Sequence, residues 1–252
     1  YDDVYIAAGF QGGYVSNRFN VGSTWWGLNA FQGEGGDDTI GGNGATRLNN
    51  ESSMIALRID LAEGVSDARF DADRSTEAYR SVGRDTFSGV FQVFGSAFDD
   101  VLLGGGAGLQ TYALGGEYFK GNAGNDLIDG RGGRDYALYT NSPEAIYADL
   151  RLPAGQVQDG WGTVDTLIDV EVIYGSSFDD TVIGSSADEA MRGERGADRF
   201  QGGDGFDKVL YHGDPAGVTV RLGGWVGSEG GLPSGWSGSA RDGWGDIDLF
   251  SS

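Results

Sequence analysis

The chain has 252 residues, of which 47 are glycine and four are proline, and its formal net charge at pH 7 is −21. So acidic a chain repels nucleic acids and anionic membrane surfaces, which argues against both as partners. It has no cysteine, so disulfides and thiolate metal sites are excluded, and its one histidine excludes a histidine-rich zinc site. No apolar run approaches the length of a membrane span. Bound divalent cations would relieve much of the repulsion among the carboxylates.

The first fifty residues predict short strands separated by glycine-rich turns. Asp2-Asp3-Val4-Tyr5-Ile6 has the pattern of the end of a turn followed by a strand. Residues 33–40 form a turn-and-strand unit whose sixth residue, Asp38, is acidic. The next unit, 41–48, has Thr46 at that place, so we expect a structural coil with a weak or absent metal site.

A longer repeat follows from about residue 51. The run VFGSAFDDVL at 93–102 returns as IYGSSFDDTV at 173–182, and no gap is needed to align the two. A strand-like segment lies upstream of each run, and a third copy of that segment starts at 218–222. The sequence stops before a third GSxFDD turn, so we expect it to belong to a longer repeat protein. Loops of different length separate the paired strands, as expected where a solenoid accepts insertions on one face.

No proline- or serine-rich linker divides the chain, so we expect one continuous solenoid. Its predicted parts are N-terminal coils (1–50), a first repeat copy (51–140), a second copy (141–212) and the start of a third, truncated copy (213–252). Helix signals are poor, and the best candidate is Asp73–Val82.

Residues 175–210 carry the strongest pattern, because they divide into four nonapeptides without a gap: GSSFDDTVI, GSSADEAMR, GERGADRFQ and GGDGFDKVL. Position one is always glycine, position six is always acidic and position eight is always large and apolar. The glycines are Gly175, Gly184, Gly193 and Gly202, the acids are Asp180, Glu189, Asp198 and Asp207, and the apolar residues are Val182, Met191, Phe200 and Val209. This pattern is typical of a parallel β-helix with cation-binding turns.

Each position has a physical role. Glycine accepts positive φ and lets carbonyl oxygens converge, and an acidic side chain can close the turn over a hard cation that prefers oxygen ligands. The last three residues form a short strand whose position eight points inward, whereas positions seven and nine point outward. Two nonapeptides make one coil, so we expect Asp180 and Asp198 to share a cation on one edge, and Glu189 and Asp207 on the other.

Other units fit the same pattern less completely. Asp100 is the sixth residue of the turn in the first long copy. The units 121–129 and 130–138 have Gly121 and Gly130 at position one, and Asp126 and Asp135 at position six. We expect Asp126 to stack on residues 103–108, which lack an acid, and its metal to be held mainly by carbonyl groups.

The nonapeptides resemble the RTX, or hemolysin-type, calcium-binding repeat family. The resemblance implies an all-β, right-handed parallel β-roll in which the turn carbonyls and the sixth-position acids hold several Ca²⁺ ions. It also implies a bacterial protein that leaves the cell through type I secretion and folds outside, where Ca²⁺ is plentiful. This chain departs from the family pattern in two ways. Positions two and four of the first two nonapeptides hold Ser, Phe and Ala in place of Gly, and Glu189 replaces Asp at position six.

Two classes of function remain open. The favoured one is a calcium-binding structural module, secreted or at the cell surface, that serves scaffold, adhesion or assembly with other copies, a surface protein or a glycan. The alternative is a lyase or epimerase that acts on an acidic polysaccharide. Tyr211-His212-Gly213-Asp214 suggests catalytic groups. The equivalent segment of the neighbouring copy, Tyr139-Thr140-Asn141, lacks the histidine, which favours a repeated strand-to-loop corner over a catalytic site. We therefore expect no catalytic residue.

Three further features have structural explanations. Trp161 and Trp244 occupy equivalent places in the long repeat, which favours a shared packing role. Trp25, Trp26, Trp225 and Trp236 lie in glycine-rich loops and are better candidates for an exposed binding face. Asp60, Asp149 and Asp165 lie beside strands and are expected to be solvated.

Overall fold

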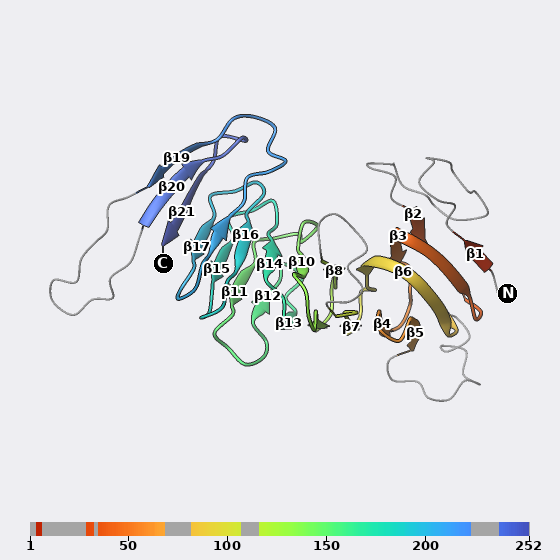
Figure 1. Ribbon diagram of the computed structural model, residues 1–252. Coiled ribbons are helices and arrows are strands. Elements are labelled where there is room, and N and C mark those ends of the chain that lie inside the picture. The colour runs from red at the N-terminus through yellow and green to blue at the C-terminus, as the bar shows by residue number, and fades with distance from the viewer. Residues whose placement is uncertain are drawn as a thin grey trace. The chain divides into compact units, whose positions relative to one another are not determined.

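The computed structural model describes residues 4–6, 29–32, 35–68, 82–106, 116–222 and 237–251. The chain divides into two compact units, one formed by residues 1–137 with 168–170 and the other by 138–167 with 171–252. The elements described in both units are β-strands (Figure 1), which confirms the predicted all-β class. Of the predicted helix Asp73–Val82, all but Val82 lies outside the described residues. Among the described residues, no helix has the length and apolarity of a membrane span.

The first unit contains two sheets that share two long strands. Strands of the first sheet follow one another in the order β1 (Val4–Ile6), β3 (Thr39–Asn49), β6 (Asp85–Phe94), β5 (Val65–Ala68), β4 (Leu57–Asp60), β7 (Val101–Leu103) and β9 (Leu127–Asp129). Every pairing is parallel except the two that β5 makes with its neighbours. The second sheet joins β2 (Asn29–Phe31), the later halves of β3 and β6, β8 (Tyr118–Lys120) and β10 (Tyr136–Leu138) in parallel.

Strand β3 corrects the prediction of a separate coil at 41–48. Residues 39–49 form one continuous strand, whose register against β6 shifts between Gly41 and Thr46. Gly42 allows this, since a Cβ there would stand 2.5 Å from the carbonyl oxygen of Gly89 on β6. The short spacing between Ile40 and Leu48 therefore reflects an irregular strand that passes from one sheet to the other, and both side chains are buried.

The second unit also has two sheets. One contains, in order, β13 (Val164–Ile168), β12 (Val157–Gln158), β11 (Tyr147–Asp149), β15 (Thr181–Ile183), β17 (Arg199–Gln201), β21 (Ile247–Ser251), β20 (Ser237–Arg241) and β19 (Thr219–Leu222). The other is a parallel ladder of β14 (Val172–Tyr174), β16 (Ala190–Arg192) and β18 (Lys208–Val209). Successive nonapeptides thus alternate between the sheets, so strands in register are two repeats apart, as predicted.

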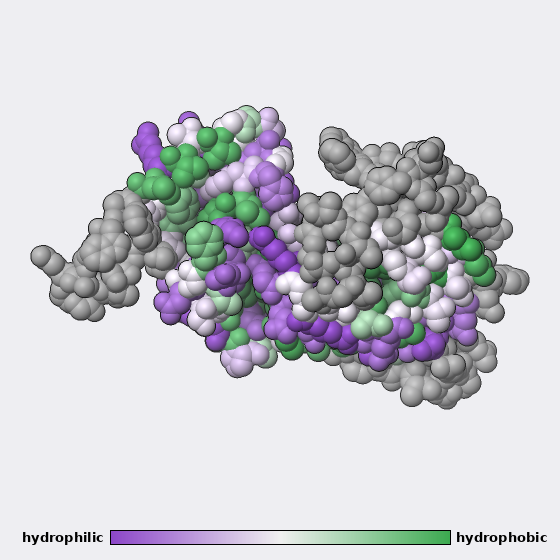
Figure 2. All heavy atoms as spheres, in the orientation of Figure 1, coloured by the Kyte–Doolittle hydropathy of each residue, from purple (hydrophilic) through white to green (hydrophobic). Residues whose placement is uncertain are grey.

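The apolar residues at position eight form the core of the nonapeptide region. Val182 lies beside Phe200 in one sheet, and Met191 beside Val209 in the other. The first three are buried, and Val209 is half-buried. Position seven is mostly solvated, with Arg199 and Lys208 exposed, although Ala190 is buried. Figure 2 shows hydrophobic surface gathered over β19 to β21, at the end of the sheet that contains β15 and β17.

Candidate metal-binding turns

The sixth-position acids of stacked turns lie against one another, as the repeat length predicts. The backbone N–H of Asp180 donates to Oδ1 of Asp198 over 2.9 Å, and the N–H of Glu189 donates to Oδ1 of Asp207 over 3.1 Å. The first pair belongs to turns that precede β15 and β17, and the second to turns that precede β16 and β18. Each acid thus fastens its turn to the preceding coil through one carboxylate oxygen.

In the first unit, Asp126 makes the same contact with an unexpected partner. Its Oδ1 accepts the N–H of Asp100 over 2.7 Å, so the turn at 121–126 stacks on the turn at 95–100. The prediction of a partner within 103–108 was therefore wrong. The spacing is 26 residues here, against 18 in the later nonapeptides, because the half-coil between the two turns is longer.

Three further acids occupy sixth-position places that the nonapeptide pattern did not identify. Oδ1 of Asp85 accepts the N–H of Asp38, and Oδ1 of Asp248 accepts the N–H of Asp198, each over 3.0 Å. Glu117 donates its N–H to Oδ1 of Asp135 over 2.9 Å. The long repeat contained a signal for Asp85, since Asp85-Thr86-Phe87 returns as Asp165-Thr166-Leu167.

The turns fall into two conformational classes. In the first class, called left-handed turns, positions two and four have positive φ. These pairs are Asn122 and Gly124 (73° and 118°), Arg131 and Gly133 (62° and 138°), Glu194 and Gly196 (68° and 118°), and Gly203 and Gly205 (95° and 110°). Positive φ is costly for a residue with a Cβ, so the glycine at position four is the part of the pattern that this backbone demands.

Glycine at position four also lets the turns stack closely. A Cβ at Gly196 would stand 2.4 Å from the carbonyl oxygen of Phe178 in the turn above, and one at Gly205 would stand 2.2 Å from that of Ala187. Contacts this short cannot be made by a real Cβ. Both glycines therefore bring a carbonyl oxygen of the neighbouring turn close to their own backbone.

The second class, called serine turns, begins at Gly95, Gly175 and Gly184 and has serine at position two. Ser176 donates its N–H to Oδ2 of Asp180 over 2.6 Å and its hydroxyl to Oδ1 over 2.7 Å. The same hydroxyl accepts the N–H of Phe178 over 3.1 Å. Ser96 makes the same contacts with Asp100, and Ser185 donates both groups to Glu189. In these turns, serine supplies hydrogen-bond donors to the acid of its own turn.

In the left-handed turn at 193–198, the acid lacks such a donor. Oδ2 of Asp198 is buried and has no hydrogen-bond partner among the described residues. A Cβ on Gly193 would lie 1.9 Å from this oxygen, so the space beside it exists only because position one is glycine. Gly202 and Asp207 repeat the arrangement, with a Cβ distance of 2.2 Å. A buried carboxylate oxygen without a hydrogen-bond donor, beside space that only glycine leaves open, fits a hard cation that prefers oxygen ligands.

Carboxylates alone do not supply a full ligand set. Among the described residues, no group of three or more His, Cys, Asp or Glu side chains could hold a metal ion. Ca²⁺ takes six to eight oxygen ligands, so most ligands here would have to be backbone carbonyls. In the serine turn that stacks on the 193–198 turn, Gly175 faces both Oδ2 of Asp180 and the carbonyl oxygen of Gly193. A Cβ added at Gly175 would lie 2.9 Å from that carbonyl oxygen.

Burial raises the pKa of Asp85, Asp180 and Asp198, because desolvation penalises their charged form. The pKa of Asp198 rises from 3.8 to about 8, first through burial and further through repulsion from Asp180 and Asp248. Burial raises the pKa of Asp85 to about 7 and that of Asp180 to about 6, the latter opposed by hydrogen bonds from Ile146 and Ser176. A cation beside these groups would reverse the direction.

The aspartates expected to be solvated are in fact buried. Asp60 is fully buried and accepts hydrogen bonds from Arg131 over 3.0 and 2.9 Å and from Arg58 over 2.8 Å. Burial raises the pKa of Asp60, but the hydrogen bonds and charge of Arg131 outweigh it and hold the pKa below its usual value. Asp165 is fully buried and accepts the Tyr139 hydroxyl, while Asp149 binds Arg151 over 2.7 Å. All three are structural acids.

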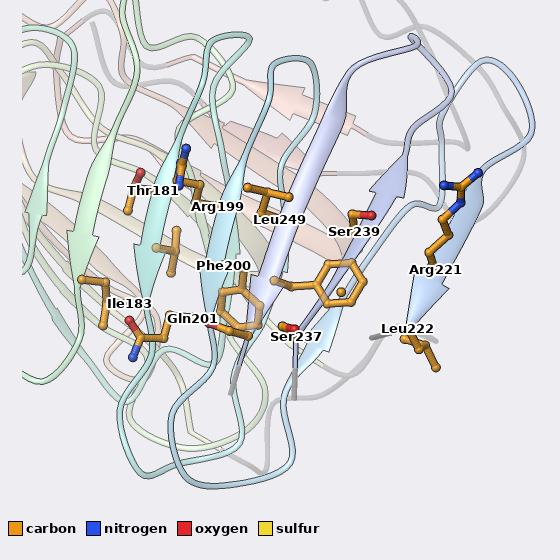
Figure 3. A pocket seen from close by; sticks show the side chains of 14 residues that line it. Thr181, Ile183, Arg199, Phe200, Gln201, Arg221, Leu222, Ser237, Ser239 and Leu249 are labelled. Atoms are coloured by element: carbon orange, nitrogen blue, oxygen red, sulfur yellow. The ribbon is translucent and has the colours of Figure 1, made fainter. Parts of the chain in front are cut away.

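The candidate catalytic residues at 211–214 contact neighbouring side chains of the roll. Nε2 of His212 lies 3.0 Å from the Tyr174 hydroxyl. Burial, and then the charge of Arg192, lower the pKa of His212. A separate hollow of about 630 Å³ lies over the outward positions of β15, β17 and β21 and beside β19 and β20 (Figure 3). Its lining has two arginines, Arg199 and Arg221, but no carboxylate or imidazole, so the hollow itself offers no general acid or base.

The two equivalent tryptophans mark a repeated loop. Oδ1 of Asp159 accepts the N–H groups of Trp161 and Thr163, and Oδ1 of Asp242 accepts those of Trp244 and Asp246. The predicted equivalence of these loops is therefore observed, although Trp161 is 36% exposed. The other four tryptophans lie outside the described residues.

Comparison with known families agrees with this geometry. The sequence matches the family described as the RTX calcium-binding nonapeptide repeat, in four copies, over residues 113–137 and 174–209. The matched segments amount to about a quarter of the chain and contain the four left-handed turns. A comparison with curated proteins found no match.

Proposed function

The chain carries RTX calcium-binding nonapeptide repeats, and from this premise we propose that it is a structural module whose folding depends on Ca²⁺. The observation that supports the proposal best is the buried Oδ2 of Asp198, which has no hydrogen-bond partner among the described residues. A buried, unpaired carboxylate costs several kcal/mol, and a bound cation removes that cost. Binding free energy thereby becomes folding free energy.

Calcium is assigned first to the left-handed turns. Their acids are Asp126, Asp135, Asp198 and Asp207. In each turn, Gly121, Gly130, Gly193 or Gly202 faces the carboxylate, with Cβ distances to Oδ2 of 1.9 to 2.6 Å. The turn backbone and the carbonyls of the stacked turn would supply the remaining ligands. The bound ion would neutralise the carboxylate and fix the spacing of consecutive coils.

The serine turns contribute differently. Asp100 and Asp180 receive hydrogen bonds on both carboxylate oxygens from Ser96 and Ser176 in their own turns, so these carboxylates do not depend on a cation in the same way. Ser185 donates only to Oε1 of Glu189, whose buried Oε2 has no partner among the described residues, so Glu189 stays a candidate ligand. In the stacked pair of Asp180 and Asp198, we assign the carboxylate ligand to Asp198 and only backbone carbonyls to the turn of Asp180. Gly184 and Gly175 then shape the carbonyl positions of their turns, and Asp38 remains a further candidate ligand, whose N–H donates to Asp85 in the stacked turn.

The proposed setting is extracellular. At low Ca²⁺ the carboxylates repel one another, and the chain cannot offset the entropy of ordering its many glycines. A chain that stays unfolded inside a bacterium and folds outside suits type I secretion and a scaffold, adhesion or surface-assembly role.

The experiment is a calcium titration of chelated protein, followed by far-UV circular dichroism and isothermal titration calorimetry. We expect β signal to appear with Ca²⁺ binding at about 10⁻⁴–10⁻³ M, the range of extracellular modules. Asp198→Asn should lower the number of bound ions, whereas the matched change Ser176→Ala should leave that number unchanged. A chain that shows no gain of β signal at about 10 mM Ca²⁺, well above that range, would contradict the proposal.

A further inference from the structure

Two loops of the second unit share a sequence pattern and are called the first and second DGWG loops. The first, residues 159–163, connects β12 to β13, and the second, residues 242–246, connects β20 to β21. In each loop, Oδ1 of the leading aspartate accepts the N–H groups of the residues two and four places later. The N–H of the glycine that follows donates over 2.9 Å to a side chain before the hairpin, Ser142 for Gly160 and Asp214 for Gly243. The two loops therefore share a backbone arrangement and differ in their side chains.

In the first DGWG loop, two hydroxyl groups supply donors to the surrounding oxygen atoms. The Thr163 hydroxyl donates to Oδ2 of Asp159 over 2.8 Å, so both oxygens of that carboxylate accept hydrogen bonds. The Ser142 hydroxyl donates to the carbonyl of Glu144 over 2.8 Å and accepts the N–H of Gly160. The first loop thus satisfies these oxygens with hydrogen bonds alone.

The second DGWG loop has carboxylates in place of both hydroxyls. Asp246 stands at the place of Thr163. Asp214 stands at the place of Ser142. An ionised carboxylate has no proton to donate, so both donors are lost. Oδ2 of Asp242 is accordingly buried without a hydrogen-bond partner among the described residues. Asp242 is 3% exposed, so solvent does not supply the missing donor.

The acids of the second DGWG loop lie close to other negative charge. The pKa of Asp248 is raised first by burial and further by repulsion from Asp242 and Asp214, which places those two carboxylates near it. Among the described residues, no lysine or arginine forms an ion pair with Asp214, Asp242 or Asp246. Oδ2 of Asp246 accepts the N–H of Gly196 instead, over 3.3 Å. A bound cation would relieve both the repulsion and the buried, unpaired oxygen.

A backbone carbonyl lies beside the same loop. A Cβ on Gly243 would stand 2.7 Å from the carbonyl oxygen of Ala216, so only glycine allows this approach. In the first loop the equivalent carbonyl, that of Glu144, accepts the Ser142 hydroxyl. Asp214 cannot provide that donor. Carboxylate and carbonyl oxygens that lack donors are the ligands that Ca²⁺ prefers.

We propose that Asp242 and Asp214 bind a Ca²⁺ ion at the second DGWG loop. Oδ2 of Asp242 and the carboxylate of Asp214 supply two ligands, and backbone carbonyls such as that of Ala216, together with water, complete the six to eight that the ion takes. The site lies outside the segments that match the nonapeptide repeat family, 113–137 and 174–209. It requires a folded chain, so the proposal rests on the calcium-dependent folding proposed above.

The ion would fasten the base of a hairpin. Asp214 precedes β19 and Asp242 directly follows β20, and these strands pair antiparallel with Thr219 opposite Arg241. One ion bound by both acids therefore joins the start of the hairpin to its end. In the first DGWG loop, the hydroxyls of Ser142 and Thr163 make the equivalent connections without a cation.

The test exchanges side chains between the two loops. The double variant Asp214→Ser with Asp246→Thr gives the second loop the hydroxyls of the first. Bound Ca²⁺ is counted by equilibrium dialysis, with far-UV circular dichroism recorded on the same samples. The double variant should keep its β signal and bind one ion fewer than wild type. The control Glu63→Gln with Glu144→Gln removes two exposed carboxylates elsewhere and should bind the wild-type number.

Two further variants separate this site from the nonapeptide turns. Asp198→Asn, added to the double variant, should remove a further ion, because Asp198 belongs to a different site. The reverse exchange, Ser142→Asp with Thr163→Asp, should give the first loop a site and add one ion.

Three results would overturn the proposal. One is a folded double variant that binds as many ions as wild type. Another is a double variant from which Asp198→Asn removes no further ion, since both changes would then act on one site. The third applies where the double variant shows no β signal, and is a folded reverse variant with the wild-type number of ions. A wild-type chain that gains no β signal in Ca²⁺ refutes the proposed function instead.

Discussion

Replacement of Asp198 by asparagine should stabilise the metal-free protein and weaken the calcium-loaded one. Asparagine keeps an oxygen for the N–H of Asp180 but cannot ionise. In the metal-free fold, burial raises the pKa of Asp198 from 3.8 to about 8. The wild-type carboxyl therefore favours folding only while it is protonated. Its contribution is complete below pH 4 and is lost as the pH rises to 8.

The size of the effect follows from that interval. Each pH unit between the unfolded and folded pKa values costs the metal-free wild type about 1.4 kcal/mol, so the loss approaches about 5 kcal/mol at pH 8. Asp198 is 3% exposed, so solvent screens little of this penalty. In saturating Ca²⁺ the sign should reverse, because the variant lacks the charge that would bind the cation.

Far-UV circular dichroism of the metal-free protein from pH 3.5 to pH 8 measures the first effect, and urea unfolding in saturating Ca²⁺ measures the second. Metal-free wild type should lose its β signal at a lower pH than Asp198→Asn, because ionisation of the buried Asp198 costs about 1.4 kcal/mol for each pH unit above 4. Wild type should also release protons when it binds Ca²⁺, and the variant should release fewer. Equal pH midpoints for the two metal-free proteins would refute the reasoning.

Other changes test individual contacts. Gly196→Ala places a Cβ 2.4 Å from the Phe178 carbonyl at a φ of 118°, so it should cost at least about 2 kcal/mol in calcium-loaded thermal unfolding. The control Gly217→Ala has open space around it and should be nearly neutral. Ser176→Ala removes the hydroxyl that donates to Asp180 over 2.7 Å, and should cost about 1–3 kcal/mol in urea unfolding. Asp60→Asn should destabilise the first unit near neutral pH, and its effect should fade in acid, since the lowered pKa of Asp60 adds stability that is present above pH 4 and lost as the pH falls further. An unchanged pH profile in that variant would exclude the ion pair with Arg131 as its cause.

The nonapeptide spacing predicted much of the second unit. A period of nine with two repeats per coil requires an interval of 18, which the contact of Asp180 with Asp198 shows. It also requires an inward position eight, and Val182, Met191 and Phe200 are buried. These features are local consequences of turn length and strand alternation, so sequence alone is sufficient for them. Which acids hold calcium stays a prediction.

Other features depend on contacts distant in the sequence. A fixed period could not locate the partner of Asp126, because the half-coil before it is longer than nine residues. Asp60 looked solvated because its partner, Arg131, is 71 residues away. Serine at position two can be read from the sequence, but its hydrogen bond to the acid of the same turn cannot. That bond forms only because the hydroxyl of Ser176 turns back onto Asp180. The irregularity in β3 likewise depends on how closely Gly42 approaches β6.

The hairpins have a practical consequence for protein engineering. Residues 61–64 connect β4 to β5, and residues 150–156 connect β11 to β12, yet the ladder that follows each hairpin keeps the same register. Loop length is thus uncoupled from the spacing of the strands. Foreign peptides, epitopes or enzyme-binding tags could be grafted between Leu150 and Gln156 as display sites, because the pairing of β11 with β15 does not depend on that loop.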